Sequence, residues 1–127
     1  MSFRVCHASE VATQAGSHPA ASRYDKCIGD KLGVRAFGLY QVELPAGAET
    51  VCHDHREDRA EDAYAVLRGS GVVVVDDEEV LVGPGDFIAV TPDATRFARA
   101  GGNGLVFIAV CAPDGVCAGG RVTPAVA

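Results

Sequence analysis

The chain has 127 residues, a mass of 13.1 kDa and a formal net charge of −6, from 17 acidic and 11 basic residues. This length allows one hydrophobic core but not a catalytic domain beside a separate cofactor domain, and a hydrophobic content of 48% is typical of a globular domain. The acidic balance disfavours a nucleic-acid partner and binding to an anionic membrane.

The first 32 residues show no clear hydrophobic period, so we expect an irregular arm there. From Gly33 onward, polar and apolar residues alternate, which predicts a strand over 34–44, closed by the turn Pro45-Ala-Gly47. A short extended piece is expected over 50–55, followed by a charged loop over 57–62.

The second half of the chain predicts several short strands separated by turns. The polar run 76–79 is expected to be a hairpin turn, and the glycine-rich run 101–104 is expected to break the chain. The expected strands cover 63–68, 70–75, 80–82, 87–90, 95–99 and 105–112. No helical pattern of ten or more residues interrupts them, so the sequence predicts an all-β fold, an antiparallel sandwich or barrel.

The cysteines and the two ends of the chain carry less information. Five cysteines are an odd number, and no two of them are spaced as CxxC. The first residues do not resemble a secretory signal, and no apolar run approaches the roughly 18 residues of a membrane span. We therefore expect a cytoplasmic protein without membrane contact, with reduced thiols, and with Cys52 and Cys111 buried as small apolar side chains.

The triplet His53-Asp54-His55 is the most informative short pattern. On a strand, residues i and i+2 point to the same face, so the two imidazoles converge. A carboxylate from the next strand would complete a site of two histidines and one carboxylate, which suits Fe, Mn, Ni, Zn or Cu. Two nearby histidines are also common on a polar surface, so the triplet needs support from its context.

That context resembles the first motif of the cupin family. The family form is G-x5-HxH-x3-4-E-x6-G, and this chain has Gly47-x5-His53-x-His55-x6-Asp62-x6-Gly69. The order of the residues and most of the spacing agree. The loop before the acidic residue is the exception, because it has six residues in place of three or four.

The segment from Gly85 to Arg96 resembles the second cupin motif, G-x5-P-x-G-x2-H-x3-N, and lies one hairpin after the first, as in cupins. The resemblance covers roughly residues 34–112. It implies a cupin-type antiparallel jelly-roll β-barrel with a pocket at one mouth. The expected organisation is an N-terminal arm over 1–32, the barrel over 33–113 and a C-terminal tail over 114–127.

The acidic ligand departs from the family pattern. The family's glutamate falls on Asp62, with Glu61 beside it, and the longer loop leaves Glu61 or Glu57 as alternatives. Strand parity favours Asp62, because it shares a face with Tyr64. We expect Tyr64 in the pocket, where its hydroxyl could orient a ligand, or else as an ordinary core aromatic.

The family's remaining ligand, a histidine, corresponds to Arg96, whose guanidinium stays protonated and cannot bind a metal. Three arrangements remain open. His53, His55 and a carboxylate could form a facial triad with open positions. Arg96 could hold an anionic ligand above that metal. Alternatively, metal binding is lost and Arg96 pairs with Asp62 or Glu61 inside the barrel.

The resemblance implies a small cupin whose pocket binds a divalent transition metal and a small anionic or polar molecule, and which could act as a metal-dependent oxygenase or isomerase. The alternative is a non-catalytic cupin that binds a small molecule with a degenerate or absent metal site. The fold does not decide between enzyme and binding protein. The resemblance also implies a homodimer paired through the arm 1–32, which would cover exposed strand edges.

Overall fold

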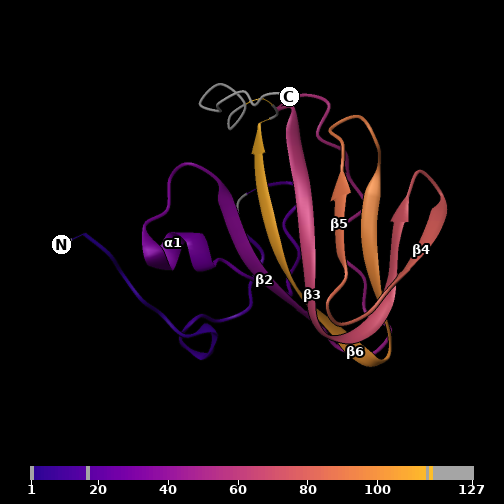
Figure 1. Ribbon diagram of the computed structural model, residues 1–127, viewed down its shortest axis with the longest axis horizontal. Coiled ribbons are helices and arrows are strands. Elements are labelled where there is room, and N and C mark those ends of the chain that lie inside the picture. Colours follow the sequence, from indigo (N-terminus) through magenta and orange to yellow (C-terminus); the bar gives the residue numbers. More distant parts are fainter. Residues whose placement is uncertain (1, 17, 114, 116–127) are drawn as a thin grey trace, which may run out of the picture.

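Two long antiparallel strands form the centre of the molecule (Figure 1). The structure is a computed structural model that describes residues 2–16, 18–113 and 115. Strand β3 (Ala60–Val75) pairs with strand β6 (Arg96–Pro113) along most of their length. Both strands curl, so each contributes to both ends of the barrel.

Shorter strands extend this central pair on both sides. β2 (Gly38–Leu44) pairs with β6, while β4 (Glu78–Val82) and β5 (Phe87–Val90) both pair with β3. Every pairing is antiparallel, which confirms the predicted all-β class. The tight turn between β3 and β4 holds Asp76 and Asp77 at φ of 48° and 69°, as a two-residue hairpin requires.

The prediction of many short strands was wrong at two places. β3 runs through the expected turn at Gly69, and β6 runs through the glycine run 101–104, where we expected the chain to break. Gly69 and Gly104 both have φ of +77°, and a Cβ on Gly69 would collide with the carbonyl oxygen of Gly104. These glycines therefore bend the paired strands at bulges without ending them.

The arm is more regular than predicted. It contains a 3-10 turn, η1 (Ala8–Glu10), a short strand, β1 (Asp25–Lys26), and a one-turn helix, α1 (Ile28–Leu32). β1 pairs with β2, and the amide of Glu43 donates to the carbonyl of Tyr24 at 3.0 Å. No helix in the described part of the chain is long and apolar enough to cross a membrane. The expected tail lies outside the described residues, except for residue 115.

The hydrophobic core lies inside the barrel, on the inner face of the sheet formed by β2, β6, β3 and β4. Its members are inward-facing side chains of β2, β3, β4 and β6, and all are less than a tenth exposed. They are Val42, Leu44, Tyr64, Val66, Val73, Val82, Ala98, Ala100, Leu105 and Phe107. Tyr64 and Phe107 lie at the edge of this core, with ring centroids 5.0 Å apart, and both also line a cavity. The core therefore forms the floor of that cavity.

Candidate metal site and cavity

The segment that carries the two histidines runs beside β6 without forming a regular strand. The expected extended piece over 50–55 is reduced to single bridges. The amide of His53 donates to the carbonyl of Arg96 at 3.1 Å, and the amide of Arg96 donates back at 2.8 Å. The amide of His55 donates to the carbonyl of Pro92 at 2.9 Å. These backbone bonds place the histidine motif directly against the second motif.

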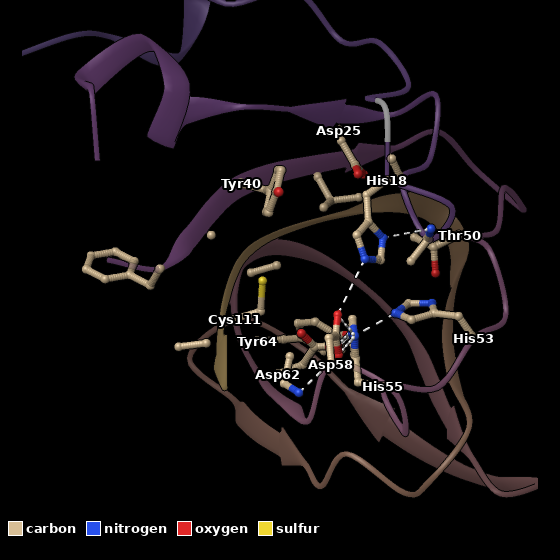
Figure 2. Close-up of a pocket in the computed structure, with 18 of the residues that line it drawn as sticks. His18, Asp25, Tyr40, Thr50, His53, His55, Asp58, Asp62, Tyr64 and Cys111 are labelled. Carbon is tan, nitrogen blue, oxygen red and sulfur yellow. Dashed lines mark hydrogen bonds and ion pairs between the residues drawn. The ribbon is translucent and has the colours of Figure 1, made fainter. Parts of the chain in front are cut away.

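One carboxylate oxygen collects the polar side chains of the site (Figure 2). The Oδ2 atom of Asp62 lies 3.8 Å from His53 Nε2 and 3.4 Å from His55 Nε2. It also accepts hydrogen bonds from Arg96 Nη1 at 2.7 Å and from the Tyr64 hydroxyl at 3.2 Å. Donor atoms of His53, His55 and Asp62 lie within 4.8 Å of one another, close enough to share a metal ion.

The other ring nitrogens of the two histidines are already bonded. His53 Nδ1 lies 2.7 Å from the carbonyl oxygen of Val51, and His55 Nδ1 lies 3.0 and 3.2 Å from the two carboxylate oxygens of Asp58. Oxygens of this kind only accept hydrogen bonds, so each Nδ1 carries a proton. The remaining nitrogen of each ring, Nε2, then faces Asp62, as in metal-binding histidines whose second nitrogen is held by an oxygen.

The electrostatics keep Asp62 ionised. Burial raises the pKa of Asp62, but the neighbouring His53, His55 and Arg96 outweigh burial and hold that pKa below its usual value. The opposite holds for Tyr64, because burial and the neighbouring Asp62 raise its pKa well above the usual value. Tyr64 is therefore a neutral phenol that donates to an ionised carboxylate.

Arg96 lies beneath the site and does not line the cavity. Its side chain is 0% exposed, Nη1 bonds to Asp62, and Nη2 donates to the carbonyl of Thr91, while Nε has no hydrogen-bond partner among the residues that the structure describes. The structure therefore brings Arg96 and Asp62 together, as the third arrangement considered above requires. The role of Arg96 as a clamp for an anionic ligand stays a prediction.

The alternative acidic residues point elsewhere. Glu61 and Glu57 are both exposed, and Glu61 lies on the opposite face of β3 from Asp62. Among the described residues, neither takes part in a group that could hold a metal. The geometry thus favours Asp62 as the carboxylate beside the two histidines.

The site opens into a cavity of about 450 Å³. The other walls come from the arm and the segment before β2, and from β2 and β6, whose contribution includes Tyr40, Ala109 and the half-buried Cys111. Burial and the charge of Asp62 raise the pKa of Cys111, so this residue is a neutral thiol. Cys111 thus lines the cavity and does not lie wholly in the core. The prediction for Cys52 was wrong, because that side chain is exposed on a segment outside the regular strands.

Two residues at the rim were not anticipated as partners. His18, whose side chain is 52% exposed, reaches from the arm to within 3.5 Å of Asp58 Oδ2, and its ring centroid lies 5.8 Å from that of His55. His18, His55 and Asp58 form a second group of possible metal ligands. No residue spacing predicts this contact, because the arm has no hydrophobic period and folds back from a distant part of the chain.

The histidine pair, the buried acid and the jelly-roll topology agree with a match to a family profile. Residues 40–111 match the Cupin domain family. The chain belongs to the cupin family. No curated protein sequence matches this cupin.

Several solved structures have a fold similar to that of this cupin, over all or part of its length. A cupin protein from Bacteroides fragilis superposes with a TM-score of 0.71 at 20% identity, covering 99% of this chain and 92% of that one. KdgF from Halomonas sp. gives a TM-score of 0.56 at 22% identity, covering 61% and 69%. A putative sugar phosphate isomerase from Acidithiobacillus ferrooxidans gives 0.58 at 24% identity, covering 68% and 56%. At these identities the likeness shows the jelly-roll fold alone.

Proposed function

We propose that this cupin holds one divalent transition metal through His53, His55 and Asp62, and that the metal binds an oxygen atom of a small molecule in the cavity. The observation that carries this proposal is the direction of the two Nε2 atoms. Both face the same ionised oxygen of Asp62, at 3.4 and 3.8 Å.

Arg96 contacts this oxygen from the buried side, but two neutral rings without a further cation on their own side of the carboxylate would be placed unfavourably. With Nδ1 protonated on each ring, both Nε2 lone pairs face a negative oxygen, and the distances exceed the usual 2.7–3.2 Å of a hydrogen bond. Either a proton on the imidazoles or a metal ion between the three groups relieves the repulsion. Imidazole and carboxylate donors suit Fe, Mn, Ni, Zn or Cu.

The chain's own residues hold the donors in place for this role. Val51 and Asp58 fix the ring orientations, while Tyr64 and Arg96 fix the carboxylate from the buried side. A bound divalent metal supplies Lewis acidity towards an oxygen atom of a ligand. Ligand access is from the cavity, whose wall includes all three proposed metal ligands.

A second candidate function is a non-catalytic binding protein without metal. The 2.7 Å bond between Arg96 and Asp62 favours it, because a guanidinium already neutralises the carboxylate that a metal would need. The two candidates share the cavity and differ in metal content. Catalysis as an oxygenase or isomerase belongs to the first candidate alone.

Metal content decides between them. Protein purified without a metal-affinity step should contain close to one transition metal per chain by elemental analysis, and the double variant His53→Ala/His55→Ala should contain none. His7→Ala removes a histidine from the arm outside the site and should keep the metal. Equal metal content in the double variant and the wild type would overturn the metal proposal, as would wild-type protein that binds no added Co²⁺.

We also propose that the protein works as a cytoplasmic homodimer paired through its arm. Phe3 and Val5 are 70% and 82% exposed on that arm, and a second copy would cover them. Light scattering should give twice the chain mass for the wild type. The variant Phe3→Ser/Val5→Ser should shift towards the monomer, and an unchanged mass would contradict pairing through the arm.

A further inference from the structure

We infer that the cavity takes a neutral molecule with one oxygen-donor group at one end and an apolar body of about aromatic size. The position of the donor group rests on the metal site proposed above. The apolar body is argued from the cavity walls alone. The family resemblance implies an anionic or polar ligand, whereas the walls of this cavity favour a neutral one.

Polar side chains gather on one side of the cavity. Figure 2 shows His53, His55, Asp58 and Asp62 together, with Cys111 to one side of them and with Tyr40 and Asp25 farther away. The strand register explains this separation. Across the sheet, Asp62 on β3 pairs with Cys111 on β6, and Cys111 pairs with Gly38 on β2. From β3 to β2, the wall therefore presents the carboxylate of Asp62, then the thiol of Cys111, then the backbone of Gly38.

The next set of residues paired across β3, β6 and β2 has an apolar residue at its centre. Tyr64 on β3 pairs with Ala109 on β6, and Ala109 pairs with Tyr40 on β2. Two aromatic side chains thus flank a small methyl group, which leaves room between them. The Tyr64 hydroxyl bonds to Asp62, so it is already occupied on the buried side.

The following row continues the apolar wall, because Val42 pairs with Phe107. A polyhydroxylated ligand lying along these rows would place most of its hydroxyls against Ala109, Val42 and Phe107, which cannot bond them. Each unpaired buried hydroxyl is costly. An apolar body would instead gain from leaving water.

The charges in the wall also disfavour an anionic ligand. The cavity is lined by Asp25, Asp58 and Asp62, and Arg35 is its only arginine or lysine among the described residues. Arg35 is exposed, and the charge of the buried Arg96 is balanced by Asp62. A divalent metal would be offset by the carboxylates around it, so little positive charge remains for an anion.

The size of the cavity fits a compact ligand. Its volume of about 450 Å³ lies within the range of small-molecule sites, roughly 300–1,000 Å³. Gly38 maintains this space, because a Cβ there would press on Cys111 Sγ and on the ring of Tyr40. The cavity thus has the proposed metal ligands at one end and, beyond them, an apolar part between Tyr40, Tyr64 and Ala109, which we call the apolar slot.

The first experiment compares two probes on the wild-type protein. 4-Ethylphenol represents the inferred class, and glucuronate represents an anionic, hydroxyl-rich ligand. Binding to Co²⁺-loaded protein is read from the visible absorption of the metal. We expect 4-ethylphenol to bind at least about tenfold more tightly, since its ethyl group and ring leave water. Equal binding, or tighter binding of glucuronate, would overturn the inference.

The second experiment tests the apolar half without any metal. The neutral dye N-phenyl-1-naphthylamine should bind the metal-free protein with a rise in fluorescence. Ala109→Phe fills the slot and should weaken dye binding by about tenfold or more. Ala89→Phe makes the same change at an exposed position on β5 and should leave dye binding unchanged. Cys111→Leu is a smaller filling change for the case that Ala109→Phe does not fold.

The two experiments separate the two proposals. If Co²⁺ does not bind but the dye does and Ala109→Phe blocks it, the metal proposal fails and the apolar slot stands. If Co²⁺ binds but the dye binds equally to the wild type and to both filled variants, the apolar slot is wrong and the metal proposal stands.

Discussion

Arg96 Nη1 lies 2.7 Å from Asp62 Oδ2, and both residues are buried, Arg96 completely. The pair joins the second sequence motif to the acidic residue of the first. Such a pair is stabilising only while both partners are present, because a lone buried charge is expensive. The relationship therefore affects both the stability of the fold and the metal affinity of the site.

The first prediction concerns stability. Asp62→Ala leaves the Arg96 guanidinium buried without its carboxylate and should lower the free energy of unfolding of the metal-free protein by about 3–5 kcal/mol. Glu61→Ala removes an exposed carboxylate from the neighbouring position and should change it by no more than about 0.5 kcal/mol. Urea unfolding followed by circular dichroism measures both. Similar losses in the two variants would show that Asp62 is not held as described.

A second prediction concerns the histidine that cupins have at the position of Arg96. Arg96→His removes the cation that competes for Asp62 Oδ2 and adds an imidazole, so Co²⁺ affinity should rise by about tenfold or more. Arg96→Gln removes the charge without adding a metal ligand and should give a smaller increase. Competition with a chromogenic chelator measures the affinities. A folded Arg96→His protein that binds Co²⁺ more weakly than the wild type would contradict the proposed ligand set.

The hydrogen bond between Asp58 and His55 gives a third prediction. Asp58 holds the Nδ1 proton of His55 and also accepts from the amide of Ala60 at 3.1 Å. Asp58→Asn keeps the shape but weakens the acceptor, and it should lower Co²⁺ affinity by about 10- to 100-fold. Glu57→Gln neutralises the adjacent exposed acid and should have no such effect. Calorimetric titration checks this, and equal affinities in both variants would argue against a supporting role for Asp58.

The fourth prediction concerns alkaline pH. Burial and, to a smaller extent, the thiols of Cys111 and Cys27 raise the pKa of Tyr40 to about 12. The unfolded chain loses this proton near pH 10. The folded state therefore binds more protons in that interval, and stability falls as pH rises from about 10 through 12.

Tyr40→Phe removes this contribution, so its thermal midpoint should fall less steeply with pH than that of the wild type. Measurements every half unit above about pH 9 give the two slopes. Parallel curves would mean that Tyr40 ionises alike in the folded and unfolded chain.

Much of the fold followed from local patterns. Alternating residues before Pro45 predicted β2, and the β-branched run before Asp76 predicted a strand and hairpin. The lengths of β3 and β6 did not follow, because glycine ends a strand in one setting and bends it in another. Which of these occurs depends on the partner strand, here on the close approach of Gly69 to Gly104.

The site was predictable where it depended on strand parity. Parity placed Asp62 and Tyr64 on one face of β3, and the structure has both facing the cavity. The contacts of Asp58 and His18 were not predictable in this way. Asp58 reaches His55 through an irregular turn in which Arg59 has φ of 59°, and His18 arrives from a part of the chain without periodicity.

The bulges of β3 also determine which acid the cavity presents. Gly69 and Gly71 each approach the backbone of β6 so closely that a Cβ would collide with it. They lie seven and nine residues beyond Asp62, about 23 and 30 Å along an extended strand. A slip of one residue would turn Asp62 outward and bring Glu61 inward while leaving an antiparallel sheet. A deleted residue between Asp62 and Gly69 would therefore put Glu61 in the place of Asp62, so the identity of the proposed ligand depends on distance along the chain as well as on residue type.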